Sequence, residues 1–260
     1  MEIFMNYNTL LIKESEAYVT ITMNRPSRRN SLSQEMVSEL NSVLQIVKTS
    51  PGYRVVILEG RDGVFCTGLD FEEIAMEQSN VDEIELTRMY MNTLRCFSLI
   101  PRVVISKVDG QVMAGGVGLV AASDLAIATS RSQFSLSEIL WGLLPSMVVP
   151  YLIRRVGFQK AYSMTLTTLP IYAEEALRIN LVDELSDSPD ESIKRLCQRL
   201  LRLDDWAIGN MKQYFRNTWI INEKMEEAAV NETSKLVSHP KVRKNIDDFV
   251  KHKIFPWSNR

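Results

Sequence analysis

The sequence predicts a mixed α/β fold with buried parallel strands, and three observations lead to this prediction. Apolar runs of strand length recur at residues 54–60, 102–108 and 125–129. A glycine-rich stretch that leads into a helical pattern separates the last two runs. Strand, loop, helix and strand in succession indicate a βαβ arrangement, and strands that are apolar throughout are typical of a sheet covered on both faces.

The chain opens with a predicted β-hairpin formed by residues 9–14 and 17–23, with a turn around Ser15. In the second strand, apolar side chains alternate with threonine, which is the period-two pattern of a half-buried strand. A polar break at residues 24–30 ends this strand.

The first predicted helix begins at a capping-box pattern, in which Ser31 and Gln34 are three residues apart. Pro51 and Gly52 end it. A second helical region is expected around residues 81–97. One face of the first helix carries the apolar residues Met36, Val37, Leu40, Val43, Leu44 and Val47.

The second half of the chain has a mainly helical pattern. Residues 172–185 predict a helix whose C′ residue, Asn180, adopts the left-handed conformation. Residues 210–237 and 241–251 predict two further amphipathic helices. A helical tail of this kind packs against neighbouring subunits or covers the core, and we favour the first alternative. Before it, residues 190–203 place one apolar face on Ile193, Leu196, Cys197, Leu200 and Leu201.

Composition and charge exclude several classes of protein. The 260 residues include 30 Lys and Arg against 32 Asp and Glu, whereas a duplex nucleic-acid binder needs a basic surplus. Three scattered cysteines do not suit a disulfide framework or a zinc site, and the only histidines, His239 and His252, lie too near the C-terminus for a His-centred triad. No signal-peptide pattern and no apolar run of about 20 residues is present. We therefore expect a cytoplasmic protein with no metal site, membrane contact or nucleic-acid partner.

Glycine is concentrated in one part of the chain. Seven of the eleven glycines lie between residues 60 and 118, and glycine is favoured where the backbone turns sharply or approaches a ligand. One interpretation is a dinucleotide fingerprint at Gly116, Gly118 and Ala121, with Glu138 as its acid. However, the turn between the strand and these glycines is too long for that motif, and Glu138 does not close the next strand.

A second interpretation explains both glycine clusters. In residues 66–70 and again in residues 113–116, a glycine lets the backbone present an N–H group to a ligand. Two such groups that converge on one carbonyl oxygen form an oxyanion hole, and the second lies at the start of a predicted helix. This arrangement suits chemistry through an enolate, which also needs a carboxylate near the α-carbon. Glu138 is the candidate.

Five stretches of the chain, in their order and spacing, resemble the crotonase (enoyl-CoA hydratase/isomerase) superfamily, over about residues 8–257. The resemblance implies the crotonase fold, an α/β spiral of ββα units with two roughly perpendicular sheets. Residues 1–200 would form this core, and residues 201–260 a helical trimerisation region that builds homotrimers or hexamers. The stretches are NRPSRRNSLS, GVFCTGLDF, VISKVDGQVMAGGVGLVAASDLAIA, FSLSEILWGLLPSMVVPYLIRRVG and EEALRINLVDEL.

The resemblance also implies the substrate class and the catalytic groups. The substrate is an acyl thioester on phosphopantetheine or CoA, with no further cofactor. The oxyanion donors are the backbone N–H groups of Leu69 and Gly115, and the catalytic carboxylate is Glu138. Family hydratases carry a second glutamate where this chain has Gly118. A single carboxylate fits a Δ3,Δ2-enoyl isomerase, or a syn dehydration in which the α-proton is returned to the departing hydroxyl.

Within the superfamily, the residues around Gly118 and Glu138 and the terminal FPW closely resemble the dehydratase-type crotonases of bacterial polyketide β-branching cassettes. This implies dehydration of 3-hydroxy-3-methylglutaryl-acyl-carrier-protein to the 3-methylglutaconyl thioester, with a decarboxylase-type crotonase as a partner. The alternatives are an isomerase or hydratase of acyl-CoA metabolism and a non-catalytic scaffold that binds a carrier protein.

The residues expected to contact substrate have simpler alternatives. Asp70 suits the cap of the following helix as well as a substrate contact. Arg28 receives a phosphate or an acidic carrier protein, or belongs to a solvated basic turn. Trp141 lines the acyl pocket or fills the core, and Cys66, with no neighbouring histidine, is expected to be a buried thiol. The residues assigned to substrate binding are Gly68, Asp70, Gly116, Gly118, Trp141 and Arg28.

Overall fold

The computed structural model describes residues 6–76 and 83–258. The chain begins with the predicted hairpin, in which β1 (Leu10–Glu14) pairs antiparallel with β2 (Tyr18–Met23). The alternation in β2 buries its apolar side chains and leaves its threonines partly exposed, so the period-two prediction is confirmed.

The larger sheet has the strand order β1-β2-β3-β5-β7-β10, and every neighbouring pair after the hairpin is parallel. The strands β3 (Val55–Glu59), β5 (Val103–Val108) and β7 (Leu125–Ala128) lie where the apolar runs predicted them. The short β10 (Glu184–Leu185) forms one edge. The prediction of buried parallel strands is confirmed.

The smaller sheet has the strand order β4-β6-β8-β9, and only its last pair is antiparallel. Its strands contain two or three residues each, which is too short for a hydrophobic period to show. Sequence analysis therefore missed them. They are β4 (Val64–Cys66), β6 (Gln111–Met113), β8 (Gln133–Ser135) and β9 (Ile171–Tyr172).

Strands of the two sheets alternate along the chain. After β5 in the larger sheet and β6 in the smaller sheet comes α4 (Gly115–Ala122), and after β7 and β8 comes α5 (Glu138–Trp141). The pair β3 and β4 is likewise followed by α2 (Phe71–Ala75). This repetition is the spiral of ββα units, and the expected fold class is confirmed. Each repeat delivers the chain to the carboxyl end of a short strand.

The first long helix, α1 (Gln34–Thr49), buries the predicted apolar face but begins at a different cap. The hydroxyl of Ser33 accepts a hydrogen bond from the backbone N–H of Met36 at 3.1 Å. Ser31 was the wrong N-cap, because its hydroxyl donates to the carboxylate of Asp70 instead, at 3.1 Å.

The middle of the chain is helical between the strands. Residue 81, where the second helical region was expected to begin, lies outside the described residues. The helix predicted over residues 172–185 is shorter than expected, but Asn180 follows its end with φ 64°, in the predicted left-handed conformation. These helices are α3 (Glu83–Leu99), α6 (Val149–Val156), α7 (Phe158–Thr167) and α8 (Ala173–Arg178).

The prediction of one helix over residues 210–237 was wrong. The first helix ends at Asn217, with Thr218 as its C-cap. A new helix begins after Asn222, whose side chain accepts a hydrogen bond from the backbone N–H of Met225 at 3.0 Å. Leu201, expected on the buried face of the preceding helix, is partly exposed because that helix ends one residue earlier. The C-terminal helices are α9 (Pro189–Leu200), α10 (Asp205–Asn217), α11 (Glu223–Val237) and α12 (Pro240–His252).

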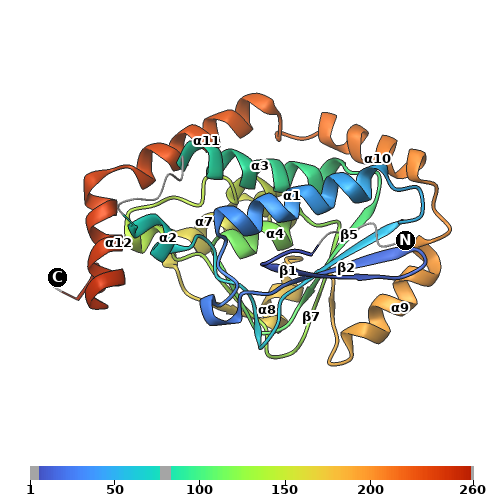
Figure 1. Cartoon of the computed structure of the whole chain (residues 1–260), viewed down its shortest axis with the longest axis horizontal. Coiled ribbons are helices and arrows are strands. Elements are labelled where there is room, and N and C mark those ends of the chain that lie inside the picture. Colours follow the sequence, from blue (N-terminus) through green and yellow to red (C-terminus); the bar gives the residue numbers. More distant parts are fainter. Residues whose placement is uncertain (1–5, 77–82, 259–260) are drawn as a thin grey trace.

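These last helices cover the core. α11 runs beside α3 and buries Ala229 and Val230 in the main apolar cluster, and α12 lies next to α2 at one end of the molecule (Figure 1). Aromatic side chains such as Trp206, Tyr214 and Phe215 nevertheless remain exposed on α10. In the part of the chain that the structure describes, no helix combines the length and the hydropathy that a membrane span requires.

Candidate active site

Three chain segments meet at one edge of the smaller sheet. Leu69 follows β4, Gly115 follows β6 and Glu138 follows β8, and these three strands are parallel neighbours. The carboxyl ends of parallel strands lie at the same sheet edge, where ligand sites are common in α/β proteins. The topology therefore brings together the three positions that sequence analysis had assigned to catalysis.

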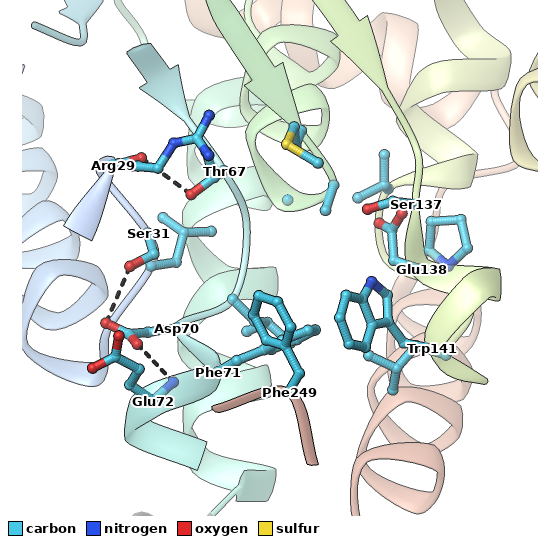
Figure 2. Close-up of a pocket in the computed structure, with 18 of the residues that line it drawn as sticks. Arg29, Ser31, Thr67, Asp70, Phe71, Glu72, Ser137, Glu138, Trp141 and Phe249 are labelled. Carbon is cyan, nitrogen blue, oxygen red and sulfur yellow. Dashed lines mark hydrogen bonds between the residues drawn. The ribbon is translucent and has the colours of Figure 1, made fainter. Parts of the chain in front are cut away.

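A cavity of about 460 Å³ lies where these segments meet. Leu69, Gly115 and Glu138 all line it. Figure 2 shows Glu138 and Trp141 on one side of the pocket, with Thr67, Asp70 and Phe71 across from them. The volume suits a small acyl group with part of its carrier arm.

The first oxyanion segment is held by its flanking peptide groups. The backbone N–H of Leu32 donates to the carbonyl oxygen of Gly68 at 2.7 Å, and the N–H of Asp70 donates to the carbonyl oxygen of Leu32 at 3.2 Å. The N–H of Leu69, between these two bonds, donates to no group within the described residues. A fixed backbone with a free donor that lines a cavity is what an oxyanion hole requires.

The second oxyanion segment is the start of α4. Gly115 is the first residue of this helix, where backbone N–H groups have no intrahelical acceptor. The residue before it, Ala114, has φ 48° and ψ −119°, a conformation that residues other than glycine rarely adopt. Its N–H donates to the carbonyl oxygen of Ser135 at 3.0 Å. The helix dipole adds a positive potential at the Gly115 N–H.

Glycines allow the two oxyanion segments to touch. A Cβ atom at Gly68 would lie 2.6 Å from the Cβ of Ala114 and 3.1 Å from the nitrogen of Gly115. A Cβ at Gly116 would lie 2.4 Å from the carbonyl oxygen of Cys66. The missing side chains of Gly68 and Gly116 thus face protein atoms and permit close packing, and the expected substrate contacts of these two residues stay predictions.

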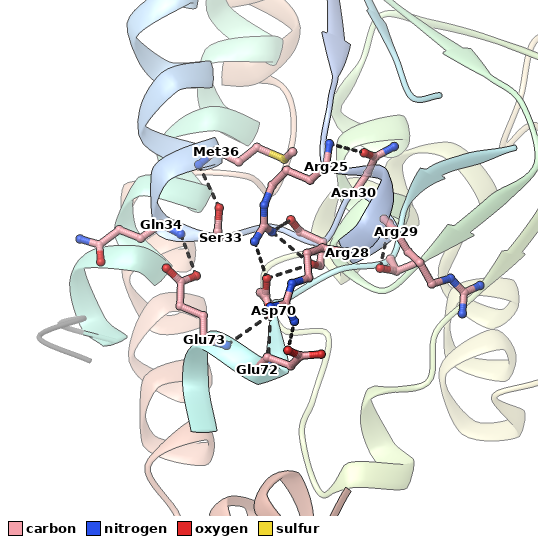
Figure 3. A network of polar contacts seen from close by, with 12 residues as sticks. Arg25, Arg28, Arg29, Asn30, Ser33, Gln34, Met36, Asp70, Glu72 and Glu73 are labelled. Atoms are coloured by element: carbon pink, nitrogen blue, oxygen red, sulfur yellow. Dashed lines mark hydrogen bonds and ion pairs between the residues drawn. The ribbon is translucent and has the colours of Figure 1, made fainter. Parts of the chain in front are cut away.

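Asp70 has a structural role, as the alternative interpretation held. Its carboxylate accepts hydrogen bonds from the backbone N–H groups of Glu72 and Glu73 at 3.1 and 3.3 Å, and so caps α2. The same carboxylate pairs with Arg25 at 2.8 Å (Figure 3). The Asp70 carboxylate is buried, and it also accepts a hydrogen bond from the Ser31 hydroxyl. Asp70 therefore caps α2 and fixes the segment after Leu69, and it also lines the pocket, where its expected substrate contact stays a prediction.

Glu138 is the first residue of α5 and is partly exposed toward the pocket. Its Oε2 atom is buried without a hydrogen-bond partner among the described residues. Burial raises the pKa of Glu138 to about 7, although the backbone N–H groups of Glu138 and Ser137 act to lower it. Near neutral pH this carboxyl exchanges between its acid and base forms, which suits a group that both takes and returns a proton.

Aromatic side chains close the pocket opposite the oxyanion segments. The ring of Trp141 meets the rings of Phe71 and Phe249 edge to face, with centroids 4.9 and 5.0 Å apart. Phe255 and Trp257 extend this cluster. Both interpretations of Trp141 hold, because it lines the pocket and belongs to an apolar cluster with α12.

Three cationic side chains line the pocket. Arg28 pairs with Glu72 (Figure 3), and Arg29 donates a hydrogen bond to the side chain of Gln111. Lys253 has its Nζ 5.3 Å from the centroid of the Phe249 ring and pairs with no carboxylate within the described residues. The Lys253 Nζ also donates to the carbonyl oxygen of Val250 at 3.4 Å. Arg29 and Lys253 are thus the pocket cations that pair with no carboxylate within the described residues.

The remaining candidates support no other chemistry. Burial raises the pKa of the Cys66 thiol to about 12, so the thiol is not a nucleophile at neutral pH. No group of three or more His, Cys, Asp or Glu side chains within residues 6–76 and 83–258 is placed to hold a metal ion.

Sequence analysis missed Tyr90, which also lines the pocket. Its hydroxyl donates to the carbonyl oxygen of Gly115 at 2.5 Å. Tyr90 lies on the buried face of α3 with Leu86, Leu94 and Phe97, and so has the pattern of an ordinary core residue. No signal in the sequence distinguished it.

Comparison with known proteins gives a consistent result. The family model described as enoyl-CoA hydratase/isomerase matches residues 13–260. The chain is 35% identical to the bacillaene synthase dehydratase PksH of Bacillus subtilis, and the match covers 98% of this chain and 99% of that protein.

Solved structures agree in fold. The crystal structure of the polyketide biosynthesis enoyl-CoA hydratase pksH from Bacillus subtilis superposes with a TM-score of 0.88, and the match covers 96% of this chain and all of that one at 35% identity. The structure of AtuE from Pseudomonas aeruginosa gives a TM-score of 0.77 at 30% identity, over 94% of this chain and 97% of that one.

Proposed function

The chain belongs to the enoyl-CoA hydratase/isomerase family, and from this premise we propose that it dehydrates a 3-hydroxy-3-methylglutaryl thioester in polyketide biosynthesis. The family makes it an enzyme of the hydro-lyase type. Its similarity to a dehydratase of bacillaene synthesis supports dehydration as the direction of the reaction. The proposed product is the 3-methylglutaconyl thioester, and the proposed carrier is an acyl carrier protein.

The observation that carries the proposal is a single unpaired carboxylate that lines the same pocket as two backbone donors. Three acidic residues line the pocket, but Asp70 pairs with Arg25 and Glu72 pairs with Arg28. Glu138 alone among the described pocket carboxylates pairs with no cation, and one of its oxygens has no partner. Addition of water by two carboxylates would need a second acidic side chain at residue 118, where this chain has glycine.

The proposed reaction uses backbone donors and one side chain. The thioester oxygen accepts hydrogen bonds from the N–H groups of Leu69 and Gly115, and ionised Glu138 takes the proton from C2. The electron pair of that C–H bond forms an enolate, whose charge develops on the thioester oxygen. Each donor of such a hole typically stabilises the transition state by about 2.7–4 kcal/mol.

The same carboxyl then completes the elimination. The enolate re-forms the thioester carbonyl, the C2–C3 double bond forms, and the C3–O bond breaks. Glu138 gives its proton to the departing hydroxyl, which leaves as water, and the carboxylate is regenerated. Both proton transfers occur on one face of the substrate, and a pKa of about 7 suits a group that acts first as base and then as acid.

The distal carboxylate of the proposed substrate needs a cation. Arg29 and Lys253 are the candidates, because Arg28 is already paired with Glu72, and of the two Lys253 lies beside the ring of Phe249. The aromatic side chains of Phe249 and Trp141 would contact the methyl-branched part of the acyl chain.

The oligomeric state belongs to the proposal as well. The exposed aromatic side chains of α10, including Trp206, Tyr214 and Phe215, are apolar area that a monomer rarely leaves in water. We therefore propose that this helical region assembles homotrimers or hexamers and that the protein acts beside a decarboxylase-type partner.

Mass spectrometry of a loaded acyl carrier protein tests the reaction. Incubation with the 3-hydroxy-3-methylglutaryl form is expected to remove one water from the carrier-bound chain. Isomerisation of a 3-enoyl-CoA without a change of mass would favour the Δ3,Δ2-isomerase, which also needs one carboxylate. Binding of the loaded carrier with no turnover of any thioester would identify a scaffold and contradict the proposal.

A further inference from the structure

Tyr90 is a buried pocket residue that the proposed reaction leaves unused. It projects from α3, is 2% exposed and lines the cavity beside Glu138. Its hydroxyl donates to the carbonyl oxygen of Gly115, the residue whose N–H is the second oxyanion donor. The Tyr90 phenol is therefore hydrogen-bonded to the backbone segment that forms the oxyanion hole.

The Tyr90 hydroxyl also fills the space above Gly118. A Cβ atom at Gly118 would lie 2.2 Å from the Tyr90 oxygen and 3.0 Å from Cγ2 of Val148. No side chain can begin at residue 118 while Tyr90 keeps this position. The Tyr90 side chain in this position therefore requires glycine at residue 118, although the two residues lie on different helices.

The protonation of Tyr90 is fixed by its surroundings. Burial raises the pKa of Tyr90 well above its usual value, and Cys66, Glu138 and Tyr151 nearby act in the same direction. The phenol remains protonated in the pH range where Glu138 titrates, so it donates to the Gly115 carbonyl throughout. It is not a second base.

The Tyr90 hydroxyl adds a restraint at the start of α4. Glycine has the most conformational freedom of any residue, and the preceding Ala114 is held at positive φ. The Gly115 N–H belongs to the Ala114–Gly115 peptide, whose carbonyl oxygen accepts from the N–H groups of Val117 at 2.9 Å and Gly118 at 3.4 Å. The Tyr90 bond to the next carbonyl, that of Gly115, restrains the first turn of α4, which holds this peptide. A donor that must point at a developing charge gains from being held before the reaction.

We propose that Tyr90 is a positioning residue that holds the Gly115 oxyanion donor and, by occupying the space above Gly118, restricts the site to the single carboxylate Glu138. The inference rests on the proposed function for its chemistry. Its steric half stands independently, because it concerns which side chains fit together.

The positioning half is tested with Tyr90→Phe, which keeps the ring and removes only the O–H. We expect kcat to fall about 5–10-fold, the equivalent of one hydrogen bond of about 1 kcal/mol, with KM within about 2-fold of wild type. Tyr151→Phe is the matched control, since Tyr151 is also fully buried and its hydroxyl faces Glu226 at 3.5 Å. Unchanged kcat in Tyr90→Phe would overturn the positioning role, as would an equal loss in Tyr151→Phe.

The steric half is tested with Gly118→Glu alone and combined with Tyr90→Ala. We expect the single Gly118→Glu variant to lose most of its thermal stability and the double variant to unfold at a higher temperature than the single one. In the double variant we also expect hydration of a straight-chain 2-enoyl thioester to rise at least about 10-fold over Tyr90→Ala. Wild-type stability of Gly118→Glu, or no recovery in the double variant, would overturn the steric half.

These readouts separate the two proposals. Thermal unfolding of the Gly118 variants needs no substrate, and the Tyr90→Phe ratio is measured on whichever thioester the wild-type enzyme converts. Failure to dehydrate the branched substrate would therefore remove the proposed function and leave the test of Tyr90 intact.

Discussion

The pocket has two walls that differ in what supplies the functional groups. The backbone wall, Leu69 and Ala114–Gly115, offers N–H groups, and the missing side chain of Gly68 lets its two segments touch. The side-chain wall is formed by Glu138, Trp141 and Phe249, which offer a carboxyl group and aromatic rings.

This difference has consequences for how each wall can be altered. Donors on the backbone wall are held by neighbouring peptide bonds and tolerate any change that keeps the N–H group and the packing. Replacement of a single carboxylate oxygen is enough to abolish the function of the side-chain wall, because no other group nearby can transfer the proton. Four predictions test this contrast, in order of decreasing expected effect.

Glu138→Gln removes the proton-transfer group and keeps the shape of the side-chain wall. We expect turnover to fall by about 10²–10⁴-fold, the range for general acid–base groups, with circular dichroism unchanged. Steady-state dehydration of the carrier-bound substrate measures the loss. Near-normal activity in the folded variant would mean that the side-chain wall does not supply the proton.

Gly115→Pro deletes a donor from the backbone wall, whereas Gly115→Ala keeps it. We expect the proline variant to lose about 10²–10³ in rate, the effect of one oxyanion donor. The alanine variant should lose far less, because its Cβ would lie 2.9 Å from Cδ1 of Leu32, a side chain that can shift.

Both Gly115 variants must be shown to fold, by circular dichroism and by the oligomeric state. Proline is tolerated at the first position of a helix, so the helix itself is not expected to break. Equal activity of the two folded variants would remove Gly115 from the oxyanion hole.

Glu138 also makes the stability of the protein depend on pH. Its pKa of about 7 in the folded state lies above the ordinary 4.5, so folding favours the protonated form. This contribution is complete below about pH 4.5, is lost as pH rises to about 7, and leaves the fold about 3 kcal/mol less stable above that. We expect Glu138→Gln to unfold at a higher temperature than wild type near pH 8 and at a similar one near pH 4.5. The same difference at both pH values would show that burial of the carboxyl is not its source.

Lys253→Gln removes an exposed cation from the rim of the side-chain wall. Ion pairs in water contribute about 0.2–1 kcal/mol, so we expect KM for the branched dicarboxylic substrate to rise by less than about 5-fold and kcat to be unchanged. Lys251→Gln is the matched control, because Lys251 is exposed and pairs with Asp247 at 3.7 Å. An equal rise in KM in the two variants would contradict a specific contact between Lys253 and the distal carboxylate. A rise in KM for a substrate without that carboxylate would contradict it as well.

The two walls also differ in how far the sequence predicts them. Glycine marks the backbone wall directly, because Gly68 and Gly116 occur where other backbone atoms approach closely, and the family resemblance assigned the donors. Glu138 was likewise identified by its position in a motif. Tyr90 and Phe249 were not, because aromatic residues on amphipathic helices have the same pattern whether they fill a core or line a pocket.

Other differences have physical causes of the same kind. The strands β4, β6 and β8 were missed because three residues cannot display a period. Ser31 was predicted as the cap because it lies three residues before Gln34, but its hydroxyl donates to Asp70, which is 39 residues away in the sequence. The break before Asn222 depends on burial of Ile221 in the core, which is a tertiary contact.

The strained backbone of Ala114 makes the oxyanion hole depend on distant contacts. A residue with a Cβ at φ 48° and ψ −119° costs on the order of 1–3 kcal/mol and persists only when its surroundings hold it there. Those surroundings are Ser135 on one strand and Gly68 on another segment, so they exist only after the smaller sheet has assembled. Without these contacts nothing holds the Ala114 peptide at positive φ. The direction of the Gly115 N–H, and with it the oxyanion hole, therefore depends on the assembled smaller sheet.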